Sequence, residues 1–305
     1  MISIVVPAYN EEESILIFFD EIEKVRQKMA VDFEYIFVND GSTDKTLQIL
    51  EALYQIHQNV HYIDFSRNFG KEAALLAGLT QSTGDFVAVM DADLQDPPEM
   101  LAEMYNLLLT GQYDVVGARR VTREGEPAIR SLFARLFYLW INKISSIEMV
   151  DGARDFRLLT RQVVTSVLEL REYNRFSKGI FSWVGYKTKY LEYKNRKRVA
   201  GATSWSFWGL LKYSIEGSIN FSNVPLQIAT YSGILSSLIA VIFIIVIVIK
   251  TIVCGDPVSG WPSLVSIILL IGGIQLFALG IVGQYIGKIY LETKQRPNYI
   301  IKEIK

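Results

Sequence analysis

The chain has 305 residues, of which 50% are hydrophobic and 21% are charged, and its formal net charge is −1. This length allows two domains, or one large domain with an appendage, and the composition excludes a disordered chain. The near-zero net charge gives no reason to expect a nucleic-acid partner. The single cysteine, Cys254, excludes an intrachain disulfide.

Short apolar runs alternate with longer amphipathic stretches in the first part of the chain. We expect strands at residues 2–7, 33–38, 60–65 and 85–90, and helices at residues 11–28, 43–55 and 71–80. This alternation predicts an α/β fold with a mostly parallel, Rossmann-like sheet that helices cover on both faces. In such sheets, ligands bind beyond the carboxyl ends of the strands.

Polar clusters follow all four of these strands, at residues 7–12, 39–44, 66–71 and 91–98. Each cluster alone has an ordinary explanation, because acidic and hydroxyl residues cap helices and Gly and Pro form turns. Ser42 and Asp44, for example, are candidates for helix N-caps. Clusters at four successive strand ends together favour a binding site.

Asp91 and Asp93 carry the sharpest chemical signal, because they lie two residues apart directly after a buried strand. Two such carboxylates can share one divalent cation, and Mg²⁺ or Mn²⁺ prefers oxygen ligands. A nucleotide diphosphate needs such a cation to offset its charge. The only histidines, His57 and His61, flank an expected helix-to-strand junction, so a zinc-type site is not expected.

Three further segments are notable, two of them amphipathic and one basic. Residues 129–144 and 206–220 have the pattern of amphipathic helices, which either lie in a membrane interface or pack on a core. The basic run 196–198 precedes the second of these stretches. It suits either phosphate groups or anionic lipid headgroups.

Residues 228–249 and 264–286 are predominantly apolar. Each is long enough to cross a bilayer, which takes about 20 residues. A pair of buried core helices is the alternative, but soluble cores rarely use apolar runs of this length. The turn at residues 254–262 contains no Lys or Arg, whereas basic residues flank the outer ends. The positive-inside rule then places both termini in the cytoplasm.

These patterns divide the chain into four expected parts. They are a catalytic-type α/β domain at 1–205, a juxtamembrane amphipathic helix at 206–227, two transmembrane helices at 228–288 and a cytoplasmic tail at 289–305.

The four strand-end clusters and the two apolar spans resemble the family 2 glycosyltransferases, which have the GT-A fold. The resemblance is greater to the polyprenyl-phosphate glycosyltransferases, the group of dolichyl-phosphate mannose synthase and the bactoprenol glucosyltransferases. It covers nearly the whole chain and rests on residues 5–12, 38–46, 66–72 and 91–99.

The resemblance implies a nucleotide-sugar site with Mg²⁺ or Mn²⁺ as cofactor. The residues implied for the donor are Pro7, Tyr9 and Glu11 beside the base and ribose, Asp40 on the base, Lys71 near the diphosphate, and Asp91 and Gln95. Asp91 and Asp93 are implied as metal ligands, and Asp93 also as a catalytic residue. An acceptor such as Asp40 suits the imide N–H of uracil, which favours a UDP-sugar, and a GDP-sugar stays open.

Asp155 matches the position of a catalytic aspartate in this family. The alternative is a helix-capping Asp, or one paired with Arg154 or Arg157. A phosphate monoester has a second pKa near ~6 and is already nucleophilic at neutral pH. Asp155 is therefore expected to orient the acceptor or balance arginines as much as to abstract a proton.

Five arginines are expected to contact phosphate groups. Loops similar to residues 196–198 close over the donor diphosphate in the family, which implicates Arg196 and Arg198. The acceptor phosphate would lie at the headgroup level, where Arg119, Arg130 and Arg135 are candidates.

The resemblance implies inverting transfer of a hexose or N-acetylhexosamine to polyprenyl (undecaprenyl) phosphate. The enzyme would be a multi-pass protein of the bacterial inner membrane, with a cytoplasmic catalytic domain, and is expected to form a homo-oligomer. A processive polysaccharide synthase is disfavoured because the chain has no Q-x-x-R-W motif. A non-enzymatic scaffold is disfavoured because Asp91, Asp93, Asp155 and Arg198 are all present.

Overall fold

The computed structural model describes residues 1–121, 150–193, 224–254 and 260–305. The chain divides into two compact units, Met1–Gly217 with Arg296–Lys305, and Ser218–Gln295. The amphipathic helices expected at 129–144 and 206–220, and the expected domain boundary at 205, lie outside the described residues.

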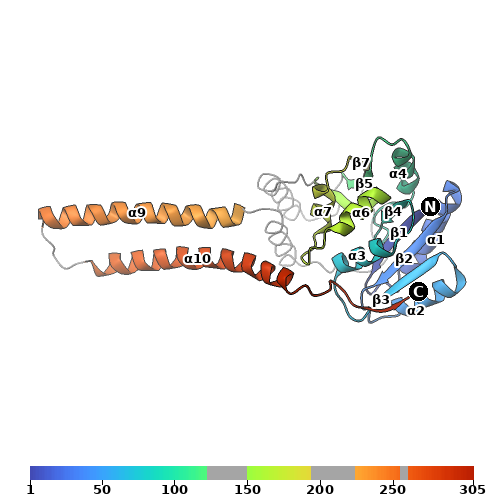
Figure 1. The fold of residues 1–305 in the computed structure, drawn as a ribbon, viewed down its shortest axis with the longest axis horizontal. Coiled ribbons are helices and arrows are strands. Elements are labelled where there is room, and N and C mark those ends of the chain that lie inside the picture. Colours follow the sequence, from blue (N-terminus) through green and yellow to red (C-terminus); the bar gives the residue numbers. More distant parts are fainter. Residues whose placement is uncertain (122–149, 194–223, 255–259) are drawn as a thin grey trace. The chain divides into compact units, whose positions relative to one another are not determined.

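A single sheet organises the described part of the first unit (Figure 1). Its eight strands are arranged in the order β7-β5-β6-β4-β1-β2-β3-β8. They are β1 (Ile2–Ala8), β2 (Phe33–Asn39), β3 (Val60–Phe65), β4 (Phe86–Val89), β5 (Val115–Arg120), β6 (Ala153–Thr160), β7 (Thr188–Tyr193) and β8 (Ile301–Ile304). The strands β1 to β4 pair in parallel, as do β5 and β7, whereas β6 and β8 run antiparallel to their neighbours. The predicted mostly parallel α/β sheet is confirmed.

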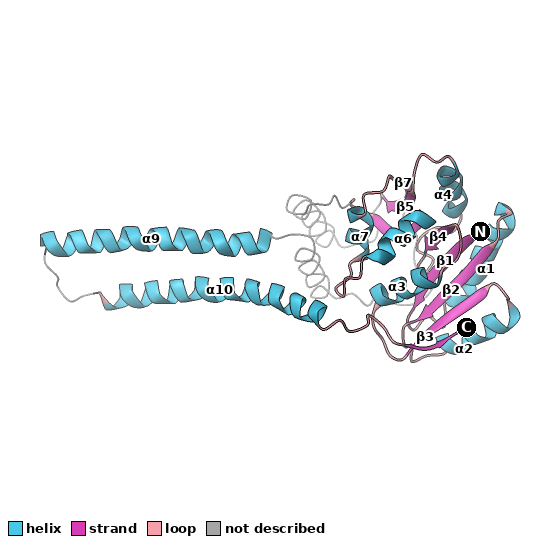
Figure 2. Cartoon of the chain, in the orientation of Figure 1, coloured by secondary structure: helices cyan, strands magenta, loops and turns pink. Residues whose placement is uncertain are grey.

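Helices cover both faces of this sheet (Figure 2). They are α1 (Ile15–Met29), α2 (Thr46–Ile56), α3 (Lys71–Gln81), α4 (Met100–Leu109), α6 (Arg161–Glu169) and α7 (Ser177–Trp183). One core joins α1, α2 and α4 to alternate strand residues such as Ile4 and Tyr35. Because side chains alternate along a strand, Val5 faces the other side, where α3 packs. A Cβ added at Gly78 of α3 would lie 2.3 Å from Cγ1 of Val5, so this close approach requires glycine.

The helices α1 and α2 begin later than their sequence patterns predict, at Ile15 and Thr46. The loops before them exchange hydrogen bonds instead. The N–H of Asn10 donates to Oγ of Ser42 at 2.9 Å, and the N–H of Lys45 donates to Oε2 of Glu12 at 2.9 Å. These contacts join the two loops to each other across the strand ends.

The two candidate N-caps differ in what they bind. Asp44 accepts from the N–H of Thr46, the first residue of α2, at 3.0 Å. The N-cap of α2 is nevertheless Lys45, without a side-chain cap hydrogen bond, so Asp44 stabilises the turn before the helix and is not its N-cap. Ser42 instead accepts from Asn10 in the neighbouring loop, so that it joins two strand ends.

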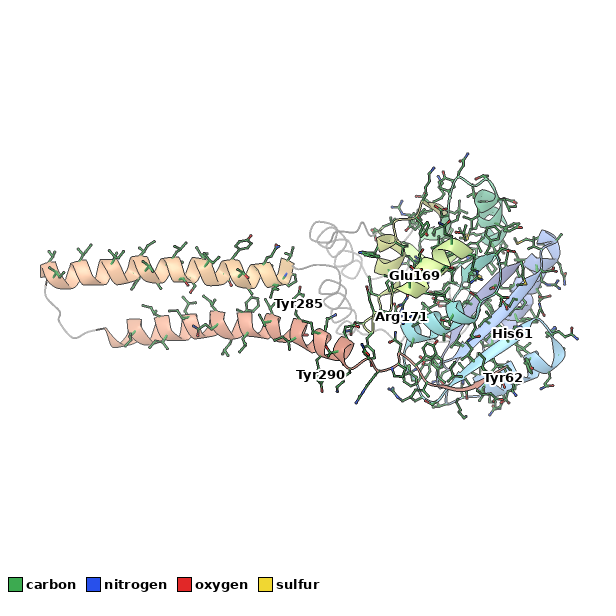
Figure 3. The ribbon with its side chains drawn as sticks, viewed as in Figure 1. His61, Tyr62, Glu169, Arg171, Tyr285 and Tyr290 are labelled. Atoms are coloured by element: carbon green, nitrogen blue, oxygen red, sulfur yellow. The ribbon has the colours of Figure 1, made fainter. Side chains whose placement is uncertain are left out.

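The histidines lie on either side of the predicted junction. His57 is the C-cap of α2, and His61 belongs to β3, where Figure 3 labels it beside Tyr62. The predicted change from helix to strand at this point is confirmed.

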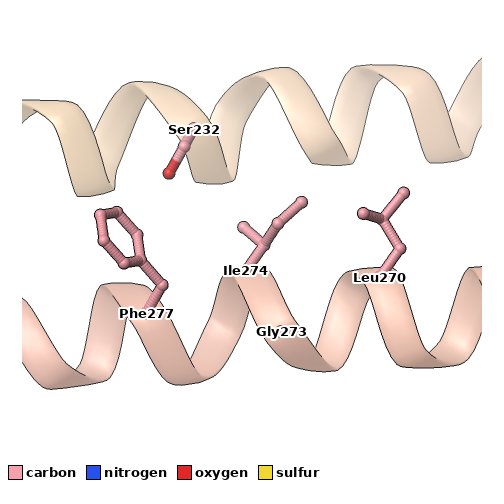
Figure 4. A pocket seen from close by; sticks show the side chains of 5 residues that line it. All are labelled: Ser232, Leu270, Gly273, Ile274 and Phe277. Atoms are coloured by element: carbon pink, nitrogen blue, oxygen red, sulfur yellow. The ribbon is translucent and has the colours of Figure 1, made fainter.

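The second unit contains α9 (Val224–Cys254) and α10 (Trp261–Thr293), which are longer than the predicted spans. Their segments Val224–Phe243 and Leu270–Thr293 have mean hydropathies of 1.8 and 1.5, and only 6% and 0% of them are buried. Figure 4 shows Ser232 of α9 facing Ile274 and Phe277 of α10. The two apolar helices thus pair with each other while exposing most of their surface, unlike buried core helices.

The residues after α10 differ most from the sequence-based expectation. Residues 289–305 were expected to form a tail, but α10 runs to Thr293 and Ile301–Ile304 form β8. This strand pairs with β3, matching Ile63 with Ile304 and Asp64 with Glu303. The C-terminus therefore lies beside β3 (Figure 1).

Candidate active site

The strand ends bring three of the predicted site residues together. Asp91 follows β4, Asp155 lies near the start of β6, and Lys71 is the first residue of α3. Because β6 runs antiparallel to β4, with Val89 opposite Arg157, the start of β6 lies at the carboxyl end of β4. The site thus forms at the carboxyl ends of the parallel strands, where ligands bind in sheets of this kind.

Lys71 bridges the two carboxylates. Its Nζ lies 2.6 Å from Oδ1 and 2.9 Å from Oδ2 of Asp91, and 2.5 Å from Oδ2 of Asp155. The three side chains are 41%, 24% and 22% exposed for Lys71, Asp91 and Asp155. The cluster is therefore partly enclosed but open to solvent and to a ligand.

This ion pair determines the protonation state of Asp155. Burial alone would raise the pKa of Asp155, but the Lys71 ammonium, with Lys178 and Arg157, holds that pKa far below its usual range. Burial likewise acts to lower the pKa of Lys71, and Asp155 and Asp91 outweigh it and raise that pKa. Both groups are therefore charged at neutral pH, and Asp155 is a weak base.

Asp93 has different surroundings from Asp91. It is 6% exposed, and its Oδ1 accepts from the N–H of Gln95 at 3.1 Å. The described residues contain no group of three or more His, Cys, Asp or Glu side chains placed to hold a metal.

Two residues of β6 and β7 anchor the segment after Asp93. The guanidinium of Arg154 donates to Oε1 of Gln95 and to Oδ1 of Asp96, both at 3.1 Å. Tyr193 donates its hydroxyl to the same Asp96 oxygen. Burial raises the pKa of Asp96, although Arg154 opposes this shift. No sequence signal singled out Asp96 or Tyr193, and a pairing of Arg154 with Asp155 was only the alternative explanation for Asp155.

Asp40 fixes the loop that precedes Lys71. It is 3% exposed, and its carboxylate accepts from the N–H groups of Phe69 at 2.6 Å and Gly70 at 2.9 Å. The next residue, Gly41, has φ +65°, and an added Cβ would lie 2.4 Å from the carbonyl carbon of Arg67. Only glycine suits this contact. Recognition of a base by Asp40 stays a prediction.

The end of β1 holds the three other residues expected beside a base and ribose. Pro7 pairs with Val38 inside the sheet, whereas Tyr9 is 48% exposed just beyond the strand. Glu11 donates its N–H to Oγ1 of Thr46 at 2.9 Å and accepts from the hydroxyl of Ser14. Tyr9 is therefore an aromatic ring presented at the strand end, where a base could stack.

Glu72 joins the first turn of α3 to α7. It accepts from the N–H of Ser177 at 2.9 Å and from the hydroxyl of the same residue. Burial raises the pKa of Glu72. The neighbour of Ser177 is Lys178, which is one of the charges acting on Asp155. No sequence signal had singled out Glu72, because its partner lies 105 residues away.

One of the five predicted phosphate-binding arginines lies in the described chain. Arg119 of β5 pairs with Glu192 of β7 at 3.2 Å and donates to the carbonyl of Asp151 at 3.0 Å. It lies opposite Ala153, near the start of β6 and two residues from Asp155. Arg130, Arg135, Arg196 and Arg198 lie outside the described residues, so their roles stay predictions.

Comparisons with known proteins identify the family of the chain and its relatives. Residues 3–243 match Glycosyl transferase family 2. The chain is 44% identical to the putative glycosyltransferase CsbB of Bacillus subtilis, over 99% of this chain and 92% of that protein. It is 43% identical to the bactoprenol glucosyl transferase of Shigella phage SfX, over 100% of this chain and 99% of that protein.

Solved structures are more distant. The mannosyl-3-phosphoglycerate synthase of Rubrobacter xylanophilus superposes with a TM-score of 0.48 at 16% identity, covering 72% of each chain. At this level the likeness carries no functional argument.

Proposed function

The chain belongs to glycosyltransferase family 2, and on that premise we propose that it transfers a sugar from a nucleotide-sugar to a polyprenyl phosphate. Relatives named bactoprenol glucosyl transferase match it over nearly their whole length, which supports a polyprenyl acceptor. Two helices long and apolar enough to cross a membrane suit such a lipid acceptor. The sugar is a hexose or an N-acetylhexosamine.

The observation that carries the proposal is the charged cluster of Lys71, Asp91 and Asp155 at the ligand-binding edge of the sheet. An ammonium between two carboxylates provides both signs of charge where a phosphorylated donor would react. Tyr9 and Asp40 lie at the adjacent strand ends, and we propose that they border the base. A UDP-sugar is the favoured donor, because a carboxylate suits the uracil imide.

Mg²⁺ or Mn²⁺ is the proposed cofactor, held by Asp91 and Asp93 with Gln95 in support. The donor set fits, because the two carboxylates supply hard oxygen atoms. When bound, the cation would offset the charge on the leaving diphosphate. Arg154 holds the Gln95 amide oxygen at 3.1 Å and so orients that segment.

The proposed reaction is an in-line displacement with inversion. An acceptor phosphate oxygen forms a bond to the anomeric carbon, while the bond from that carbon to the diphosphate oxygen breaks and the nucleoside diphosphate leaves. Since the acceptor phosphate is largely dianionic above about pH 6, no proton must be removed. Asp155, which is ionised in the free enzyme, is therefore proposed to orient the acceptor and not to act as a general base.

We place the catalytic unit on the cytoplasmic side of a bacterial inner membrane, with α9 and α10 crossing as a pair. The basic residues near the outer ends of the helices, including Lys288, Lys294 and Arg296, support this orientation. A homo-oligomer is proposed because most of the surface of both helices is exposed in the single chain.

The test is a transfer assay in membranes that contain the full chain. Undecaprenyl phosphate, Mn²⁺ or Mg²⁺ and a panel of labelled UDP- and GDP-sugars are supplied, and label is counted in the organic phase. We expect transfer from one donor, lost on chelation and in Asp93→Ala, and retained in the matched control Asp20→Ala on the exposed side of α1. Folded, nucleotide-binding protein that labels no lipid would instead support the scaffold function.

A further inference from the structure

Lys71 already neutralises a carboxylate that the proposed metal site needs. Its ammonium contacts both oxygens of Asp91 at 2.6 and 2.9 Å. The same ammonium contacts Oδ2 of Asp155 at 2.5 Å. A divalent cation that binds Asp91 must therefore compete with a cation supplied by the chain itself.

The charge balance of this cluster shows why the competition matters. Two carboxylates and one ammonium leave a single negative charge, compared with two if Lys71 were absent. A divalent cation would also approach a positive charge at short range, which is costly in a partly enclosed site. We therefore expect a bare metal ion to bind weakly while Lys71 occupies the site.

A bound donor changes this balance. Its diphosphate adds negative charge and offers the ammonium a new partner, and lysine binds phosphate as a mobile point charge on a flexible stem. Once Lys71 turns to the diphosphate, the oxygens of Asp91 are released for the metal ion.

The surrounding contacts restrict the movement to the side chain of Lys71. On one side, the N–H of Gly70 is held by Asp40 at 2.9 Å. On the other side, Glu72 is held by the N–H of Ser177 at 2.9 Å. The Lys71 side chain itself is 41% exposed. The backbone is thus fixed on both sides of a side chain that has room to reorient.

We infer that Lys71 is an exchangeable counter-ion, which holds Asp91 and Asp155 together without donor and moves to the donor diphosphate so that Asp91 can bind the metal ion. Metal and donor binding are then coupled, each strengthening the other, as thermodynamic reciprocity requires. This inference rests on the proposed function, because it assumes a diphosphate donor and a metal ion at Asp91.

The experiment measures Mn²⁺ binding to the full chain in detergent by the loss of the electron paramagnetic resonance signal of free Mn²⁺, without nucleotide. We expect Lys71→Met to bind Mn²⁺ about tenfold more tightly than the wild type, within the usual range of coupling between sites. Lys71→Arg keeps the charge and should resemble the wild type. Lys24→Met, which removes an exposed lysine of α1, is the matched control.

The same variant should have the opposite effect on the donor. UDP binding at saturating Mn²⁺, followed by calorimetry, should weaken by about tenfold in Lys71→Met, because the diphosphate loses its ammonium partner. A purely structural role of Lys71 would weaken the binding of both ligands. The opposite signs therefore separate counter-ion exchange from a general loss of structure.

Thermal unfolding keeps the inference testable if Lys71→Met folds poorly. Without the ammonium, two carboxylates face each other, so the variant should melt at a lower temperature and regain more stability from Mn²⁺ than the wild type. Lys71→Gln provides a second uncharged variant. Unchanged or weaker Mn²⁺ binding by both folded variants would overturn the inference. Transfer activity of the wild type, lost on chelation, would still support the proposed function in that case.

Discussion

Asp155 and Asp91 can share a site because the Lys71 ammonium lies between them. The family resemblance implied a role for each of the three residues but gave no reason to pair them, because Lys71 and Asp155 lie 84 positions apart. Local sequence suggested Arg154 and Arg157 as partners of Asp155. The folded strands instead place Arg154 against Asp96. Residue roles of this kind depend on strand pairing, which composition and spacing do not determine.

The low pKa of Asp155 leads to a prediction on pH dependence. Its folded pKa lies below the ordinary value of about 3.9, so its ionised form stabilises the fold above about pH 4, and this contribution is lost as the pH falls toward the folded pKa. Between pH 5 and 9 Asp155 should not titrate. The fall of kcat/KM in acid should then follow protonation of the acceptor phosphate, whose second pKa is about 6.

A pH–rate profile of Asp155→Asn checks this assignment. We expect lower activity with the acid limb at the same pH as in the wild type. If the limb disappears in the variant, Asp155 is the titrating base and its proposed orienting role is wrong.

Arg154 and Arg119 provide a matched pair for a stability prediction. Arg154→Met leaves the carboxylate of Asp96, which is 5% exposed, without its guanidinium. Breaking a buried pair costs about 3 kcal/mol of unfolding free energy. Arg119→Met removes an ion pair whose side chains are 39% and 58% exposed, which should cost less than about 1 kcal/mol.

Chemical denaturation of both variants, in detergent with the same lipid content, measures this difference. Equal losses would mean that burial of Asp96 does not govern the stability of the segment after Asp93.

At the scale of elements, periodicity predicted the alternating strands and helices well because each is a local pattern. Helix starts were less accurate, since the loops before α1 and α2 bind each other across the strand ends. The strand β8 was missed entirely. The strand has only four residues, which are mixed in polarity. Its partner β3 lies more than 200 residues earlier in the chain. Such non-local pairing leaves almost no trace in a single sequence.

The segment around β8 also supports the loop that leads to Lys71. The ring of Tyr299 stacks on Phe65 at 5.0 Å, and Phe65 contacts Phe69 at 5.7 Å. Nζ of Lys302 lies 3.3 Å from Oδ2 of Asp64. We expect Tyr299→Ala to lose about 1 kcal/mol of unfolding free energy, as for other aromatic pairs, and to raise the donor KM more than it lowers kcat.

Tyr299→Phe keeps the stacked ring and should restore both quantities. Steady-state kinetics and denaturation of the two variants therefore separate loss of the ring from loss of the hydroxyl. An unchanged donor KM in Tyr299→Ala would show that the loop does not depend on this contact.

For the whole molecule, the proposed orientation can be tested with introduced cysteines, because Cys254 is the only native one. In a Cys254→Ser background, Gly260→Cys lies before α10 at a position with open space around it. Glu13→Cys lies in an exposed loop of the first unit. If both helices cross the membrane with the catalytic unit inside, an impermeant thiol reagent should label the first variant in intact cells and the second only after lysis.

Labelling of both variants in intact cells would place the catalytic unit outside and contradict the proposed use of cytoplasmic nucleotide-sugars. Labelling of neither before lysis would indicate that the helices do not span.

The pairing of β8 with β3 has a consequence for biosynthesis. The ribosome makes β3 early and β8 only after both apolar helices, and domains generally fold in the order of their synthesis. Until then β3 is left as an open edge that could pair with another chain. The sheet can be completed only if the segment after α10 returns to the compartment in which the first strands folded. A chain that inserts only one of the two helices could not complete the sheet, and its β3 edge would stay open.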